Sequence, residues 1–361
     1  MIRCAINGRF LTQPITGVQR YAFEVVSALD DLLTSQSDLR SGYSFEVLTP
    51  QSGRMDTHWR HIPVRKVGAY SGHLWEQLEL PRHLQGRLLI GLANTGPIGI
   101  RRQIVTIHDA SVSAAPAGYS QAFRLWYRIL MRILGKTARG VVTDSCFSRD
   151  ELHRWFGIPM EKVAVIPLGG DHVLRVASDS AVFDGREWAS RPFVLAAGSL
   201  NPNKNLGALL ETAVRLNESG ISLIIAGGAN QRVFSTAKWT FTPNVHCLGY
   251  VSDAALRALY ERALCLVFPS KYEGFGLPPI EAMACGCPVV ASNAASLPEV
   301  CGNAARYVDP HSPGDIADRV MEVVTSATVQ NDLRRLGRER AGSYQWVQSA
   351  RQWLALIEAN R

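Results

Sequence analysis

Two glutamates on either side of a glycine-rich turn are the residues of this sequence best suited to chemistry. Residues 271–292 read KYEGFGLPPIEAMACGCPVVAS and place Glu273 and Glu281 eight positions apart. Gly274 and Gly276 allow a positive φ and a close approach of the backbone to a ligand. Carboxylates at both ends, with backbone amides between them, could hold a sugar that carries a diphosphate.

The residues after this turn predict a short helix. Pro278 and Pro279 suit the first turn of a helix, where the missing N–H group is not needed. We expect Glu281 in that first turn, beside the unpaired amides and the positive end of the helix dipole. We expect the helix to stop at Gly286 and a buried strand to follow at 287–291. Two glutamates alone would also fit a capped helix behind a surface loop, but the glycines, prolines and strand favour a ligand site.

A lysine and a histidine follow two further predicted strands. The strand at 193–197 leads into the loop GSLNPNKN, in which Lys204 precedes a helix. A lysine near the positive end of a helix dipole is unfavourable unless an anion is close. The strand at 104–107 ends at His108, and parallel sheets bind ligands at the carboxyl ends of their strands. A solvated lysine and a structural histidine are the alternatives.

A glycine loop follows the first predicted strand, residues 2–7, and precedes a helix from about 18 to 33. Gly17 stands just before that helix. A strand, a glycine loop and a helix in this order can face a phosphate, although no G-x-G-x-x-G is present. An ordinary βα loop is the alternative.

Strand and helix patterns alternate along the whole chain and predict an α/β protein with two doubly wound, Rossmann-like domains facing across a cleft. We expect an N-terminal domain at 1–172, a linker at 173–190 and a second domain at 191–344. The last helix, 345–361, is expected to pack back on the first domain. The other expected strands are 45–49, 88–92, 141–144, 223–226, 245–248 and 264–268.

Length and composition agree with a globular protein of two domains: 361 residues, 47% apolar and 19% charged. The seven cysteines lie mostly in apolar runs and predict core thiols in a reducing compartment. Cys285 and Cys287 have no second pair at zinc-ligand spacing, so we expect no metal site. The sequence has no stretch typical of a signal peptide or a membrane span, which predicts a cytoplasmic protein.

A basic stripe runs along the helix expected at 122–139, where four cations are spaced four residues apart: Arg124, Arg128, Arg132 and Lys136. Such a stripe fits either contact with an anionic membrane surface or a solvated helix face. The formal charge of +7 also raises the question of nucleic acid. No nucleic-acid-binding signature is present, and none is expected as a partner.

The segment 271–292, followed by LPE at 297–299, resembles the E-x7-E signature of the GT-B retaining glycosyltransferases of family 4. QIVTIHD at 103–109 and VAVIPLGGD at 163–171 resemble further segments of that family. The resemblance implies transfer of a hexose from a nucleotide sugar with retention of configuration and without a cofactor. No Asp-x-Asp triplet occurs, so we expect a metal-independent reaction.

The resemblance also implies a role for each motif residue. Glu273 holds a donor-sugar hydroxyl and stabilises positive charge at the anomeric carbon, and His108 borders the sugar. Lys204 clamps the diphosphate together with backbone amides, and Glu281 binds the ribose. The expected catalytic residues are Glu273, His108 and Lys204. The expected donor-binding residues are Gly17, Ser199, Lys204, Val251, Gly274, Phe275, Gly276, Leu277 and Glu281.

The motifs look most like bacterial polysaccharide and O-antigen enzymes that use GDP-mannose, and donors with dTDP-, GDP-rhamnose or UDP-sugar are alternatives. The implied acceptor is a glycan on a polyprenyl diphosphate carrier, reached from the inner face of the cytoplasmic membrane. One departure stands out, because Ser199 and Asn203 lie where many relatives carry an arginine. An inactive relative, a GT-B sugar-nucleotide epimerase and a glycan-binding module are therefore kept as alternatives.

Overall fold

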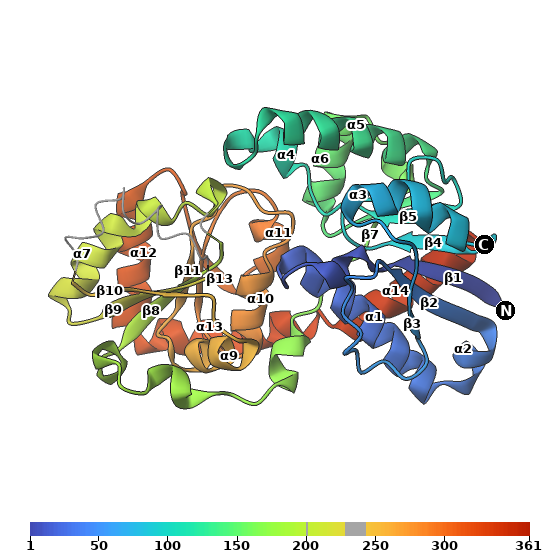
Figure 1. Cartoon of the computed structure of the whole chain (residues 1–361). Coiled ribbons are helices and arrows are strands. Elements are labelled where there is room, and N and C mark those ends of the chain that lie inside the picture. Colours follow the sequence, from blue (N-terminus) through green and yellow to red (C-terminus); the bar gives the residue numbers. More distant parts are fainter. Residues whose placement is uncertain (200, 228–242) are drawn as a thin grey trace. The chain divides into compact units, whose positions relative to one another are not determined.

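The computed structural model describes residues 1–199, 201–227 and 243–361 and divides into two compact units (Figure 1). The first unit comprises 1–168 and 346–361, and the second comprises 169–345. Residues 173–190, expected as a linker, lie within the second unit. Phe183 and Trp188 of this segment are buried, and the Trp188 ring lies 5.7 Å from that of Phe193 in the next strand. Two aromatic side chains therefore fix a segment that has no regular hydrophobic pattern.

The first unit contains a seven-stranded parallel sheet with the order β3-β2-β1-β4-β5-β6-β7. From β1 the chain extends the sheet first towards β3 and then, from β4, in the other direction. The point of reversal lies between β1 and β4. The strands are β1 (Ile2–Asn7), β2 (Tyr43–Thr49), β3 (Val64–Lys66), β4 (Leu88–Gly91), β5 (Gln103–Thr106), β6 (Gly140–Thr143) and β7 (Val163–Val165).

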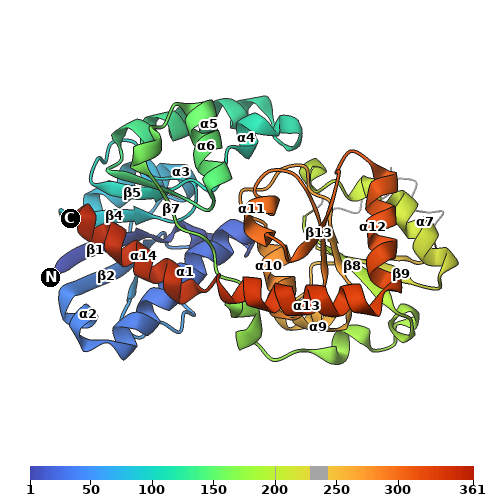
Figure 2. The ribbon, with the colours of Figure 1, turned by 180° about the vertical axis from the view of Figure 1, so that it is seen from behind.

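Helices cover both faces of this sheet (Figures 1 and 2). Ala5, Leu89, Val105 and Val141 occupy matching register positions and pack against the segments α3 to α6. The opposite face is covered by α1 and α14. The helices of this unit are α1 (Gly17–Ser35), α2 (Ser37–Gly42), α3 (Gly72–Leu74), α4 (Ser111–Ala114), α5 (Gln121–Thr137), α6 (Cys146–Phe156) and α14 (Trp346–Ala359).

The C-terminal helix α14 belongs to the first unit although the chain reaches it only after the second. Trp346, Ala350, Trp353 and Leu354 are buried on one side of it. The Trp353 indole N–H donates to the hydroxyl of Tyr21 on α1 at 2.9 Å, which joins the two helices behind the sheet (Figure 2). The contact anchors α1 from the far end of the chain.

The segment 71–85 differs from the single helix that its pattern suggests. It begins as α3, continues as a π-helix over Trp75–Glu79 and ends as a 3-10 helix over Leu80–His83, which contains Pro81. A π-helical turn often marks a functional or strained position. Here it coincides with Trp75 and Glu76, whose side chains are completely buried.

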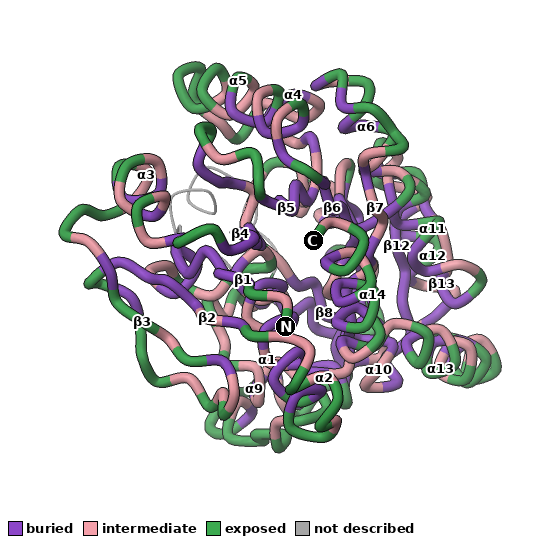
Figure 3. Tube along the Cα trace, turned by 90° about the vertical axis from the view of Figure 1, so that its right-hand side faces the viewer, coloured by how far each residue is buried: buried purple, intermediate pink, exposed green. Residues whose placement is uncertain are grey.

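The second unit contains a six-stranded parallel sheet with the order β10-β9-β8-β11-β12-β13. Its point of reversal lies between β8 and β11. Figure 3 shows both sheets as mostly buried segments beneath helices with exposed sides. The strands are β8 (Phe193–Ala197), β9 (Ser222–Ala226), β10 (Val245–Gly249), β11 (Leu266–Phe268), β12 (Val289–Ser292) and β13 (Ala305–Val308).

Two layers of helices also enclose the second sheet within the described part of the chain. Side chains of α7, α12 and α13 form one core with the sheet, to which Val194, Leu216, Val290 and Val320 contribute. The helices are α7 (Leu210–Glu218), α9 (Asp253–Arg262), α10 (Leu277–Ala284), α11 (Leu297–Cys301), α12 (Pro313–Thr325) and α13 (Ala327–Gly342). The predicted α/β fold with two doubly wound parallel sheets is confirmed. No helix of the described ranges is long and apolar enough to cross a bilayer.

Candidate active site

Two of the expected catalytic residues meet at the point of reversal of the second sheet. Lys204 follows β8 and Glu273 follows β11, the two strands between which the order reverses. The Lys204 ammonium lies 2.6 Å from Glu273 Oε1, with side-chain exposures of 21% and 12%. Ligands of open α/β sheets bind at this place. The sheet topology therefore joins residues that are 69 positions apart in the sequence.

The loop after β8 holds Lys204 by bonds to the neighbouring strand ends. Residues Pro202–Lys204 form a 3-10 turn, and Asn205 follows with φ at +55°. The Asn205 side-chain amide donates to the carbonyls of Pro269 and Pro310. The backbone N–H of Lys271 donates to the Asn203 carbonyl at 2.8 Å, which ties the two loops together. Ser199 is exposed, and Leu200 of this loop lies outside the described residues.

A serine that the sequence analysis missed holds the turn that carries Glu273. The buried Ser296 hydroxyl lies 3.0 Å from the carbonyls of both Glu273 and Phe275. Gly276 adopts φ of +99°, and a β-carbon there would come within 2.6 Å of the Leu297 side chain. Gly274 lies outside the left-handed region. The available signal was the serine directly before the Leu-Pro-Glu of α11.

The prolines lie in the first turn of α10, as predicted, and the helix ends before Gly286. The expectation for Glu281 was wrong: it lies in the second turn, because α10 begins at Leu277. Glu281 Oε1 lies 3.0 Å from His172 Nε2, and the Tyr260 hydroxyl donates to Oε2 at 3.0 Å. Burial and the nearby Glu281 carboxylate raise the pKa of Tyr260. Neither partner carried a sequence signal.

In the first unit, His108 follows β5 and is almost fully buried. Its Nδ1 lies 2.8 Å from Asp144 Oδ2, and its Nε2 lies 3.2 Å from the carbonyl oxygen of Leu92. Both partners are acceptors, so both ring nitrogens must donate, as only the protonated ring does. Burial alone would lower the pKa of His108, but the Asp144 carboxylate raises it. This geometry favours a charge-bearing role over proton transfer to a ligand.

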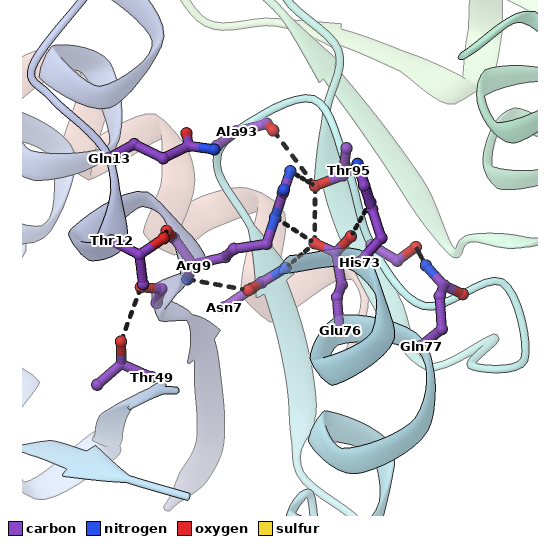
Figure 4. A network of polar contacts seen from close by, with 12 residues as sticks. Asn7, Arg9, Thr12, Gln13, Thr49, His73, Glu76, Gln77, Ala93 and Thr95 are labelled. Carbon is purple, nitrogen blue, oxygen red and sulfur yellow. Dashed lines mark hydrogen bonds and ion pairs between the residues drawn. The ribbon is translucent and has the colours of Figure 1, made fainter. Parts of the chain in front are cut away.

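A buried polar network lies at the point of reversal of the first sheet (Figure 4). Glu76 Oε1 accepts from the side chains of Asn7 and Thr95, both at 2.7 Å, and lies 3.3 Å from Arg9 Nε. His73 Nδ1 lies 3.3 Å from the other oxygen. Burial would raise the pKa of Glu76, but the bonds from His73, Arg9, Thr95 and Asn7 hold it below its usual value. The sequence analysis missed this network.

The remaining expected residues lie on two helix starts. Gly17 is the exposed first residue of α1, and no atom lies within 4 Å of where its β-carbon would be. Its amide is among those that an α-helix leaves without an intrahelical partner. Val251 stands between β10 and α9 and is half-buried. Both positions follow a strand, at the edge where such sheets bind ligands.

The chemistry available to the second unit follows from this geometry. An ammonium, a carboxylate and the first amides of α10 are gathered at one strand edge, which suits a ligand with an anionic part and a hydroxylated part. Within the described ranges, no three His, Cys, Asp or Glu side chains are grouped to hold a metal. Burial raises the pKa of the Cys265 and Cys301 thiols to about 12, as expected of core residues.

Comparison with known proteins agrees with the fold and the motifs. A family described as "Glycosyl transferases group 1" matches residues 182–340, and one described as "Glycosyltransferase Family 4" matches 15–173. The O-antigen chain mannosyltransferase B of Escherichia coli is 29% identical over 357 residues, 92% of this chain and 93% of that protein. The O-antigen chain mannosyltransferase RfbU of Salmonella typhimurium is 30% identical, over 58% of each chain.

Solved structures agree with the fold. Sucrose-phosphate synthase from Thermosynechococcus elongatus superposes with a TM-score of 0.76 at 19% identity, over 99% of this chain and 98% of the other. WaaG, a glycosyltransferase involved in lipopolysaccharide biosynthesis, gives 0.70 at 16% identity over 99% of both chains. The fold and the charged strand edge are those of the GT-B class of glycosyltransferases. The chain belongs to the group 1, family 4 glycosyltransferases and is a transferase enzyme.

Proposed function

We propose that this enzyme transfers mannose from GDP-mannose, with retention of configuration, onto a glycan carried on a polyprenyl diphosphate. The observation that carries the proposal is the Lys204–Glu273 pair at the strand edge of the second sheet. The names of the relatives support mannose, since several are O-antigen or GDP-mannose-dependent mannosyltransferases. Rhamnose or another hexose carried on a dTDP-, GDP- or UDP-group is the alternative donor.

The pair suggests how the donor engages the enzyme. In the structure the Lys204 ammonium neutralises Glu273. A diphosphate carries more charge than one carboxylate, so we expect it to take over the ammonium as a partner. Glu273 then becomes available to a hydroxyl of the donor sugar. Donor binding would thereby prepare both residues for the reaction.

The proposed reaction breaks the bond between the anomeric carbon and the diphosphate oxygen and forms a bond from that carbon to an acceptor hydroxyl oxygen. The acceptor proton passes to the departing phosphate oxygen on the same face of the sugar. Lys204 stabilises the negative charge that develops on the diphosphate, and Glu273 stabilises the positive charge at the anomeric carbon. Groups already held in place stabilise such charges without reorganisation.

The other residues are proposed to bind and orient the donor. Amides of Gly17 and of the turn 274–277 would contact the diphosphate, and Ser199 would support it from the loop after β8. Glu281 would accept from the ribose hydroxyls while Tyr260 and His172 hold its carboxylate. The base would lie near Val251. The cationic His108 would add positive charge from the first unit.

A panel of nucleoside diphosphates and sugar nucleotides in a thermal-shift assay tests the donor. A bound ligand stabilises the folded protein by RT ln(1 + [L]/Kd), so GDP and GDP-mannose should raise Tm most. A larger shift with UDP or dTDP compounds would replace GDP-mannose by that donor. No shift with any nucleotide would contradict the proposal and favour a glycan-binding module.

A second assay separates the transferase from the two alternative enzymatic outcomes. Labelled GDP-mannose is incubated with and without a mannose-terminated acceptor, and the products are separated. Transfer that requires the acceptor, with an α-linked product from the α-linked donor, is expected. An epimerised nucleotide sugar formed without acceptor would indicate an epimerase. Nucleotide binding with no turnover would indicate an inactive relative.

The proposed acceptor also determines where the enzyme works. Nucleotide sugars of this kind are used in the cytoplasm, and a polyprenyl diphosphate is anchored in a bilayer. We therefore propose that the enzyme acts at the inner face of the cytoplasmic membrane as a peripheral protein. Recovery of the enzyme and its activity in the membrane fraction, with release by high salt, is the expected result.

A further inference from the structure

The outer side of α5 exposes large apolar side chains. Leu125 is 62% exposed and Ile129 is 46% exposed, and the adjacent Trp126 is 39% exposed. The buried residues of α5 lie on its opposite side: Leu130, Met131, Leu134 and Gly135. A contiguous exposed apolar surface of this kind usually marks a contact with a protein or a membrane.

Two cations continue the same stripe towards the C-terminal end of α5. Positions 125, 129, 132 and 136 are separated by four, three and four residues, which places them on one side of the helix. The stripe therefore begins with Leu125 and Ile129 and ends with Arg132 and Lys136, which are both exposed. A helix with this arrangement can insert one half among acyl chains while the other half contacts headgroups.

The cations of α5 have no carboxylate partner in the part of the chain that the structure describes. Elsewhere, arginines on helices are paired with acids three or four positions away, as in Arg257–Glu261, Arg319–Glu322 and Arg335–Glu339. On α5, Arg132 donates weakly to the Trp155 carbonyl at 3.4 Å. No aspartate or glutamate occurs from residue 110 to 143. An anion for these cations must therefore come from outside this segment.

The apolar side of α5 adjoins a second exposed element. The His73 ring on α3 lies 5.9 Å from that of Trp126. The next residue on α3, Leu74, is 63% exposed. Figure 1 shows α3 and α5 on the same side of the first unit. The α5 face, defined here as Leu74, Leu125, Trp126, Ile129, Arg132 and Lys136, is thus formed by two elements.

We propose that the α5 face docks the enzyme on an anionic lipid bilayer, with α5 lying in the plane of the interface. Arg132 and Lys136 contact the headgroups, and Leu125, Trp126 and Ile129 enter the acyl boundary. Charge complementarity favours this partner, because unpaired cations beside apolar side chains match anionic headgroups above hydrocarbon. The inference rests on the proposed function only in that a polyprenyl-linked acceptor requires a membrane.

Flotation with vesicles tests the charge. The wild-type protein should float with vesicles of phosphatidylglycerol and phosphatidylethanolamine and stay below with phosphatidylcholine alone. The variant R132E/K136E should reduce the floated fraction at least fivefold. The control R319E/R335E changes the net charge by the same amount on α12 and α13 and should float like the wild type. An equal loss in both variants would overturn the assignment to this face.

A second pair of variants tests the apolar contact. L125S/I129S should also lower flotation, and the remaining binding should disappear in 0.5 M salt because only headgroup contacts are left. The control V214S removes an exposed apolar side chain from α7 and should change nothing. If L125S/I129S instead dissolves a dimer while vesicle binding is unchanged, the face binds a second copy of the chain.

Activity on a soluble acceptor separates this inference from the proposed function. R132E/K136E and L125S/I129S should keep nucleotide-induced stabilisation and transfer to a short soluble glycan. They should lose transfer to an acceptor in vesicles. Vesicle binding by a protein that shows no transferase activity would retain the docking face and reject the function. Unchanged vesicle binding in both variants would reject the face.

Discussion

The two sheets have charged pairs at equivalent places, but only one pair is suited to binding a ligand. Between β1 and β4, Glu76 is completely buried and is contacted by Asn7, Arg9, His73 and Thr95. Between β8 and β11, Glu273 is partly exposed and pairs with Lys204. A carboxylate with several partners is fixed, whereas one with a single cationic partner can exchange it. The first place is filled by the protein itself, and the second is left for the donor.

This difference gives the two places different tasks. Thr95, which donates to Glu76, is next to Asn94, whose side chain accepts from the backbone N–H of His108 at 2.8 Å. The first network therefore supports the loop that positions His108. The second pair lies directly in the proposed reaction. Mutations should accordingly affect stability at the first place and catalysis at the second.

The largest effect is expected for Glu273→Ala, which should lower transfer at least about 10³-fold, as removal of a preorganised group does in other enzymes. Nucleoside diphosphate affinity should stay equal or rise, because Lys204 loses its internal partner. A transfer assay and isothermal titration with GDP measure the two quantities. Transfer at the wild-type rate would remove Glu273 from the mechanism.

Glu76→Ala should destabilise the first unit by about 3–5 kcal/mol, because it leaves Arg9 buried without its carboxylate. Urea unfolding followed by tryptophan fluorescence measures the change. The double variant R9M/E76L, which removes both charges, should recover a large part of the loss. If Glu76→Ala lowers transfer and leaves stability unchanged, the distinction between the two places is wrong.

Lys204→Met should weaken nucleoside diphosphate binding and transfer together, each by about 10²-fold, since the cation acts in both the bound state and the transition state. Lys271→Met is the matched control. Lys271 is exposed on the adjacent loop and should tolerate the change with less than a threefold effect. Equal losses in both variants would indicate a general electrostatic effect instead of a specific clamp.

The smallest effect concerns pH. The raised pKa of His108, caused by Asp144 against the effect of burial, means that the folded state binds the proton more tightly than the unfolded state. The resulting stabilisation is complete below the unfolded pKa of about 6.5 and is lost as pH rises through the folded pKa. The urea midpoint should fall over this range in the wild type. Asp144→Asn should flatten the dependence, and an equal slope in both proteins would contradict the pairing.

Much of the fold could be predicted because its signals are local. The first strand, Ile2–Asn7, agrees with the pattern at both ends, and α10 follows its prolines and stops before Gly286. The helix at 72–83 could not be predicted in detail. Its π-helical turn depends on the burial of Trp75 and Glu76 against distant strands, which no local pattern contains.

The candidate site could be predicted in its residue types and only partly in its contacts. Glu273, Lys204 and His108 were chosen from motifs at strand ends, and the structure gives each of them a charged partner. Ser296, Tyr260 and His172 were missed, because each reaches the site from another element. The place of Glu281 was wrong by one helical turn, since the proline pair did not define where the helix begins.

By itself, the sequence determined the alternating strands and helices, the motif residues and the acid-free segment from 110 to 143, since each depends on neighbours within a few positions. Only the tertiary structure decided which carboxylate meets which cation. Glu76 and Asn7, like Glu273 and Lys204, are 69 positions apart and meet because the strand order reverses between their strands. Sheet order arises from packing of the whole unit, and that packing buried Glu76 and left Glu273 partly exposed.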